Sequence, residues 1–103
     1  MPSRWTPEGL ADAVARSERL SLRHLKRPGK SLRESRVRLI AAFLGRDAGF
    51  SIAAMARSFG REESTFNRGV RRLEDVMAQN PELRARVEEI SESLRVGNTG
   101  IHD

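Results

Sequence analysis

The spacing of apolar residues constrains this chain more than any other feature. Between Thr6 and Leu94 they recur every three or four positions, and no stretch alternates apolar with polar residues for more than a few positions. A period near 3.6 gathers side chains on one face of an α-helix, whereas a period of two is typical of a strand. The sequence therefore predicts an all-α fold without a β-sheet.

Residues that favour helix ends divide this region into six segments. Five segments follow a side chain that can cap a first turn, namely Thr6, Ser21, Ser31, Ser51 and Asn80. Glycine or proline stands at most of the junctions between segments. We expect a six-helix bundle at 6–94, an N-terminal extension at 1–5 and a flexible tail at 95–103.

The segment from Ser31 to Gly45 carries two apolar stripes. One stripe has the i, i+3, i+4, i+7 spacing and the second lies beside it. Because a helix with two apolar faces must be covered on two sides, we expect this helix at the centre of the core. The two stripes are Val37, Ile40, Ala41 and Leu44, and Leu39 and Phe43.

Composition excludes several classes of function. The chain has 103 residues, no Cys and two His, which rules out disulfides, thiolate catalysis and thiolate metal sites. No catalytic triad can be assembled from His24 and His102. No apolar run approaches the roughly 18 residues of a membrane span, and no signal-peptide pattern is present. We expect a soluble cytoplasmic domain that is not an enzyme, with no cofactor, metal or small-molecule substrate.

Charge is segregated along the chain. Residues 16–46 contain ten basic residues against two acidic ones, and residues 57–72 contain five against two. Residues 74–94 reverse the sign, with six acidic residues against two basic ones. Such a cationic surface attracts polyanions, and the basic segment lacks the aromatic residues and wide apolar face of a membrane-surface helix. The predicted partner is double-stranded DNA, in the nucleoid, with a monomeric domain as the simplest state.

The stretch from Ser51 to Leu73 has the spacing of a helix-turn-helix. That motif needs two short helices, a small residue where they cross, and a glycine in the turn. Ala56, Gly60 and Phe66 provide the small residue, the turn and the inward anchor of the second helix. The sequence therefore predicts a recognition helix at about 63–77.

Helical geometry separates the inner and outer faces of this recognition helix. At about 100° per residue, Phe66 shares an arc with Val70, Leu73 and Met77. The candidate DNA-contacting residues lie opposite, on the flanks or just before the helix, and Gly69 indicates a close contact with a neighbouring helix. The candidates are Arg61, Ser64, Thr65, Asn67, Arg68 and Arg71.

A basic loop precedes the motif and provides the second group of candidates. Its side chains are expected to contact phosphates, and the loop to reach an adjacent minor groove. They are Lys26, Arg27, Lys30, Arg33 and Arg36.

Several short motifs carry a family resemblance. They are Ser51-Ile52, Met55-Ala56, Phe59-Gly60, Arg61-Glu62-Glu63-Ser64-Thr65-Phe66, Arg71-Arg72-Leu73-Glu74 and Arg36-Val37-Arg38. Their order over 6–94 resembles the C-terminal DNA-binding domain of the bacterial replication initiator DnaA, and the similar domain that ends some REP-associated and insertion-sequence tyrosine transposases. The resemblance implies a helical domain of the Trp repressor and DnaA C-terminal type. It also implies major-groove contacts near Arg61, Ser64 and Thr65, with a minor-groove role for the basic loop.

The chain departs from the family pattern at four places, and at one of them Arg68 stands where the family has a histidine. The family's second glycine after Phe59-Gly60 is missing, and Leu32 stands where simple counting places the loop's base-reading arginine, flanked by Lys30 and Arg33. Glu62-Glu63 replaces an Asp-His pair; these acids either cap the helix or accept hydrogen bonds from cytosine amino groups. No Walker-type sequence and no tyrosine is present, so neither an ATPase module nor a tyrosine nucleophile lies in this chain.

A second class of function remains open at the level of sequence. In this alternative the chain is a protein-interaction or transcription-regulator module whose basic face is incidental, and its acidic last segment docks a protein partner or a second copy of the chain. The acids of this segment are Glu82, Glu88, Glu89 and Glu92.

Overall fold

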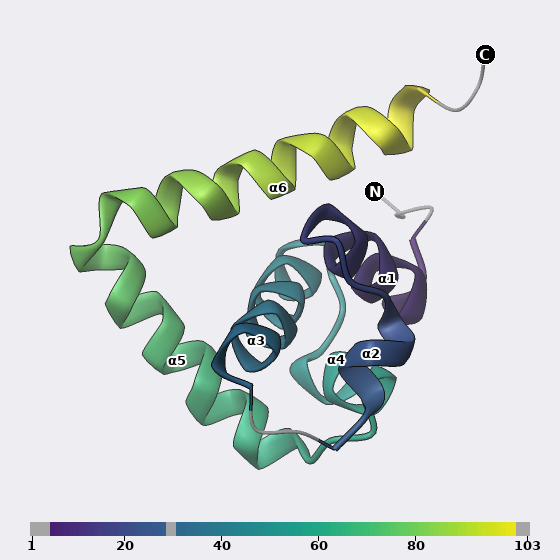
Figure 1. The fold of residues 1–103 in the computed structure, drawn as a ribbon, viewed down its shortest axis with the longest axis vertical. Helices are drawn as coiled ribbons and strands as arrows, with labels where there is room; N and C mark the ends of the chain where they lie inside the picture. The colour runs from purple at the N-terminus through teal and green to yellow at the C-terminus, as the bar shows by residue number, and fades with distance from the viewer. Residues whose placement is uncertain (1–4, 29–30, 101–103) are drawn as a thin grey trace.

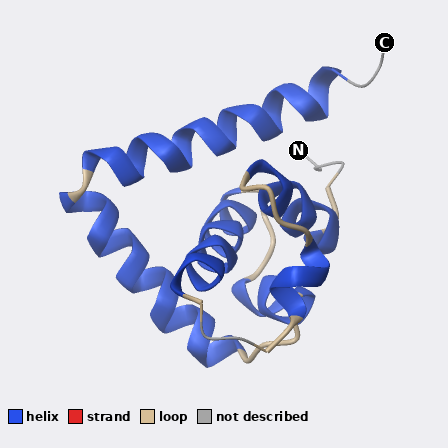
Figure 2. Ribbon diagram, in the orientation of Figure 1, coloured by secondary structure: helices blue, strands red, loops and turns tan. Residues whose placement is uncertain are grey.

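The protein is all-α. The computed structural model describes residues 5–28 and 31–100, and this part of the chain folds into six helices without a strand (Figures 1 and 2). The helices are α1 (Pro7–Ser17), α2 (Leu22–Lys26), α3 (Leu32–Asp47), α4 (Ile52–Ser58), α5 (Glu63–Gln79) and α6 (Pro81–Gly100). No helix in the described ranges combines the length and the apolar character needed to cross a membrane.

All five predicted N-caps are confirmed. The hydroxyl oxygens of Thr6, Ser21, Ser31 and Ser51 each accept a hydrogen bond from the backbone N–H three residues later, over 2.9–3.3 Å. The side-chain oxygen of Asn80 accepts from the Leu83 N–H over 3.1 Å. Because the first N–H groups of a helix have no partner within it, these side chains define where each helix begins.

Helix α3 occupies the centre of the fold, as its two apolar stripes predict. It packs against α1, α4 and α5, and Figure 1 shows it enclosed by them. Its main stripe is buried, and the second stripe, Leu39 and Phe43, is half-buried against the same core. Helix α3 therefore sets the positions of α4 and α5 relative to the basic loop that precedes it.

Gly69 of α5 packs directly against Leu39 of α3, which confirms the close contact predicted for it. A Cβ atom at this position would lie 2.6 Å from Leu39 Cδ2. Glycine weakens a helix by about 1 kcal/mol relative to alanine, and the close approach explains why it is tolerated here.

The predicted end of the last helix is wrong. Helix α6 continues to Gly100, past the expected boundary at Leu94, so residues 95–100 are helical rather than a flexible tail. Glycine at 97 and 100 disfavours a helix without terminating it. Residues 101–103, the rest of the predicted tail, lie outside the described residues, as do residues 1–4 of the N-terminal extension. Trp5, the last residue of that extension, packs against the core.

Helix α6 starts at the C-terminal end of α5 and crosses to the α1 side of the fold (Figure 1). Leu83, Val87 and Ile90 are buried there. The Arg86 guanidinium forms an ion pair with Glu18 at the end of α1 and donates a hydrogen bond to the Ser17 carbonyl oxygen over 3.3 Å. The acidic helix is thereby held away from the N-terminal half of α5.

Asp12 connects α1 to α2. Its carboxylate accepts a hydrogen bond from Arg16 Nε over 2.7 Å and from the Leu22 N–H over 3.0 Å. These two donors hold the pKa of Asp12 below its ordinary value. A lowered folded-state pKa means that the carboxylate stabilises the fold above about pH 4 and loses this effect as the pH falls through the lower folded-state pKa.

We expect Asp12→Ala to lower the free energy of unfolding by about 1 kcal/mol at pH 7. The difference from the parent protein should shrink by pH 3, which urea titrations at the two pH values measure. Asp75→Ala, at an exposed aspartate of α5, is the control, with less than about 0.5 kcal/mol expected. An equal loss for Asp12→Ala at both pH values would contradict the assignment.

Candidate nucleic-acid interface

Helices α4 and α5 are joined by a short turn that depends on Gly60. Gly60 has φ +68°, in the left-handed region that a side chain disfavours. The Arg61 N–H then donates to the Ala56 carbonyl oxygen over 2.9 Å, which closes the turn. Phe59 is fully buried, and its ring centroid lies 5.8 Å from that of Phe66. The two aromatic rings hold the end of α4 against the first turns of α5.

The two faces of α5 are those the periodicity predicts. Phe66, Val70, Leu73 and Met77 are buried. The side chains predicted to face outward are exposed, and these are Ser64, Thr65, Asn67, Arg68 and Arg71. Helix α5 therefore presents hydroxyl and guanidinium groups along the first half of its solvent face.

The two acids at the start of α5 do not cap it with their side chains. Glu62 occupies the N-cap position, but its side chain makes no capping hydrogen bond. Glu63 accepts a 3.5 Å hydrogen bond from the Asn67 side-chain amide. The capping interpretation is therefore wrong for Glu62, and Asn67 is held against an acid of its own helix.

Arg61 links the turn to the basic loop. Its guanidinium donates to the backbone carbonyl oxygen of Arg27 over 3.0 Å and reaches that of Lys26 over 3.5 Å. Sequence reasoning placed Arg61 among the residues that contact DNA directly. In the structure the Arg61 guanidinium has a positioning role. Two of its N–H groups donate to the end of α2 and hold it beside the start of α5.

The other basic residues predicted for the loop differ in whether their side chains are available to contact DNA. Lys26, Arg27 and Arg36 are exposed. Arg33 instead donates to the Glu18 carbonyl oxygen at the end of α1, so its guanidinium is engaged away from the loop. Lys30 lies outside the described residues. Leu32 is 86% exposed at the start of α3.

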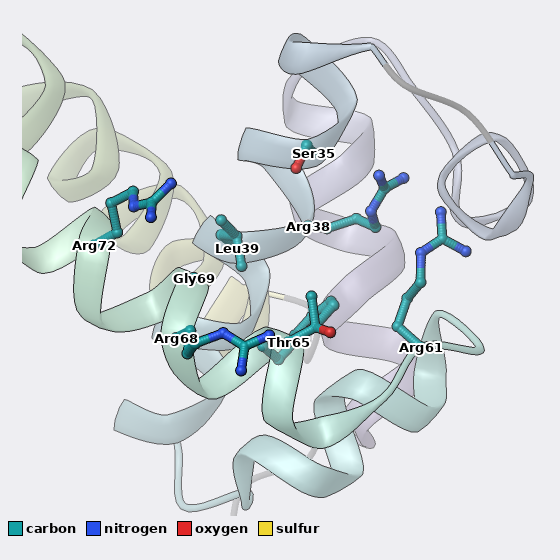
Figure 3. A pocket seen from close by; sticks show the side chains of 9 residues that line it. Ser35, Arg38, Leu39, Arg61, Thr65, Arg68, Gly69 and Arg72 are labelled. Atoms are coloured by element: carbon teal, nitrogen blue, oxygen red, sulfur yellow. The ribbon is translucent and has the colours of Figure 1, made fainter.

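A pocket of about 310 Å³ lies between α3 and α5. Leu39, Phe66 and Gly69 line its apolar part. Four arginines and two hydroxyl-bearing residues also line it, and they are Arg38, Arg61, Arg68, Arg72, Ser35 and Thr65. Figure 3 shows Arg38 and Arg61 extending to the same side of the gap between the helices, with Arg68 reaching toward Thr65.

Arg38 is the buried member of this group. It is 6% exposed, and its guanidinium donates to the Leu25 carbonyl oxygen over 3.1 Å. Burial is the main cause that lowers the pKa of Arg38, and the positive charge of Arg61 adds to it, whereas Glu34 acts in the opposite direction. Sequence reasoning did not select Arg38, although the Arg36-Val37-Arg38 motif was a signal for it.

Ser35 and Arg72 were also missed. Ser35 lies on α3 and Arg72 on α5, and both line the pocket only because α3 packs against α5. No local sequence pattern pairs these two residues.

Cationic and acidic surfaces are separated in space. In Figure 1 the N-terminal end of α5 lies beside the end of α2 and the start of α3, whereas α6 crosses the opposite end of the fold. Arg16 and Arg46, two of the basic residues at 16–46, form ion pairs with Asp12 and Glu74. On α6, Glu89 and Glu92 pair with Arg86 and Arg95. Among the described residues, Lys26, Arg27, Arg36 and the arginines that line the pocket form no ion pair, and Glu62 and Glu63 lie exposed next to Arg61.

Within the described ranges, no group of three or more His, Asp or Glu side chains is placed to hold a metal ion. No family model matches this chain, and none of the curated proteins compared with it shows significant similarity.

Proposed function

We propose that this protein binds double-stranded DNA in a sequence-specific manner. One observation carries the proposal: Arg61 joins the exposed N-terminal face of α5 to the basic loop, on the side of the fold away from acidic α6. A helix that presents guanidinium and hydroxyl groups beside a cationic loop suits a groove edge and its flanking phosphates.

The α4–α5 pair and the basic loop contact different parts of the DNA. The α4–α5 pair acts as a helix-turn-helix, and the first half of α5 enters the major groove with Ser64, Thr65 and Arg68 toward base edges. Lys26 and Arg27 contact the backbone on the adjacent side. A single module of this size buries roughly 600–1,000 Å² of protein surface.

The motif order supports a finer proposal. It resembles the C-terminal domain of DnaA and of related transposases, so we propose a DNA-binding domain of a DnaA-like or transposase-like bacterial protein that acts at the nucleoid. Selection of bound duplexes from a randomised library separates these roles. Enrichment of an initiator-type box favours replication, and enrichment of a repeat beside a hairpin favours transposition.

Salt dependence tests the proposal directly. If five to seven cationic groups contact phosphates, the slope of log K against log[salt] should lie near −5. Fluorescence anisotropy with a labelled duplex at several salt concentrations measures it. Absent binding, or binding that salt does not change, would contradict the proposal.

Alanine variants test the division between base reading and backbone contact. We expect Ser64→Ala and Arg68→Ala to change which sequences are preferred, because each removes a group directed at base edges. Lys26→Ala and Arg27→Ala should weaken all duplexes alike. The same loss for all four variants on every sequence would refute the division.

A further inference from the structure

The pocket between α3 and α5 concentrates positive charge that the protein itself does not neutralise. Among the described residues, no carboxylate forms an ion pair with Arg38, Arg61, Arg68 or Arg72. Glu34, on the same helix as Arg38, acts on it only through its charge. Arg38 and Arg61 repel each other, and Arg68 and Arg72 add further positive charge to the lining, so an anion in the pocket stabilises the arrangement.

Two of the four groups are fixed before any ligand arrives. Arg38 is 6% exposed and is bonded to the Leu25 carbonyl oxygen. Arg61 is bonded to the carbonyl oxygens of Lys26 and Arg27. Donors already held in position lose little conformational freedom when an anion binds. The guanidinium fork also matches the oxygens of a phosphate better than an ammonium group does.

We propose that this pocket binds one phosphate group. Guanidinium groups of the arginines that line the pocket provide charge-assisted hydrogen bonds, and the Ser35 hydroxyl provides a neutral one. The hollow lined by Leu39, Phe66 and Gly69 leaves room for the group. A cavity of about 310 Å³ accepts a phosphate that is either free or part of a longer chain.

The DNA backbone is one source of this phosphate, and for that source the inference rests on the proposed function. A phosphodiester in the pocket would set the position of α5 in the groove. It would also act on the basic loop, because Arg61 touches both the pocket and the loop backbone. The other source is a free phosphate, and separate measurements distinguish the two.

The first measurement uses inorganic phosphate and no DNA. Phosphate is added at constant ionic strength to ¹⁵N-labelled protein, and we expect the amide signals of Thr65 and Gly69 to shift in a saturable way. Arg72→Gln, at an exposed residue, should weaken this binding at least about fivefold because one charge-assisted contact is lost. Arg57→Gln removes the same charge from an exposed residue of α4 outside the pocket and should change it less than about twofold.

Arg38→Met provides a second variant, chosen because methionine preserves much of the buried volume. Circular dichroism establishes that each variant is folded before it is titrated. A phosphate affinity that stays the same in folded Arg72→Gln and Arg38→Met would overturn the proposal, as would an absence of shifts in the parent protein.

The second measurement uses a 20-base-pair duplex in low salt. If the phosphate belongs to DNA, Arg72→Gln should lower duplex affinity and reduce the salt slope by about 1. If Arg72→Gln weakens the binding of inorganic phosphate but leaves the duplex affinity unchanged, the pocket binds a free phosphate. A parent protein that binds phosphate in the pocket and no duplex would refute the DNA-binding function and leave the phosphate site standing.

Discussion

Phe59→Ala is expected to lower the free energy of unfolding by about 3–5 kcal/mol. Phe59 is fully buried, and its ring packs on Phe66 where α4 meets α5. Truncation leaves a cavity at the junction that positions α5, and α5 is the helix we propose for the groove. Since a domain of this size has a total stability of about 5–15 kcal/mol, the loss should be evident in a urea titration.

Leu32→Ala provides a matched control for this cavity. Leu32 is also a large apolar residue, but it is 86% exposed, so its truncation should change stability by no more than about 0.5 kcal/mol. Similar losses for the two variants, or a loss below about 1 kcal/mol for Phe59→Ala, would show that the α4–α5 junction is not a packed part of the core.

Reversing two charges on α5 should have the largest effect on DNA binding. Arg68 and Arg71 are exposed on the face proposed to meet DNA. Arg68→Glu combined with Arg71→Glu replaces two positive charges that attract the DNA by two negative charges that its phosphates repel. Like charges brought together at an interface cost several kcal/mol, so we expect duplex affinity to fall roughly 100-fold or more near 0.1 M salt.

The control for this experiment changes the net charge equally at another place. Arg84 and Arg95 are exposed on α6, so Arg84→Glu with Arg95→Glu should lower affinity less than about tenfold, through long-range electrostatics alone. Anisotropy titrations of both double variants give the comparison. Equal losses would show that binding follows total charge and not the α5 surface.

Local chemistry explains which expectations the structure confirms. A capping residue such as Thr6 or Ser51 satisfies backbone groups within three residues of itself, so helix starts can be predicted from short stretches. The buried face of α5 follows from the period of its apolar residues. The end of α6 was misplaced for a related reason, because glycine lowers helix propensity without specifying where a helix stops.

The candidate site was only partly predictable. Exposure of Arg68 and Arg71 follows from the helical period, whereas the partners of Arg61 and Arg33 do not. Arg61 donates to backbone atoms more than thirty residues earlier in the chain, and Arg33 donates to the carbonyl of Glu18, fifteen residues away. A net charge counted along the sequence cannot separate guanidinium groups that are free to meet DNA from those that are already bonded.

The all-α class, the helix starts and the inward face of α5 follow from the sequence alone, since capping and apolar periodicity act over a few residues. Which arginines come together at one pocket depends instead on how the helices pack. Arg38 and Arg72 lie on different helices, and α3 and α5 bring them to one pocket by packing closely where Gly69 has no side chain. Such a meeting depends on contacts between distant parts of the chain, which no local pattern encodes.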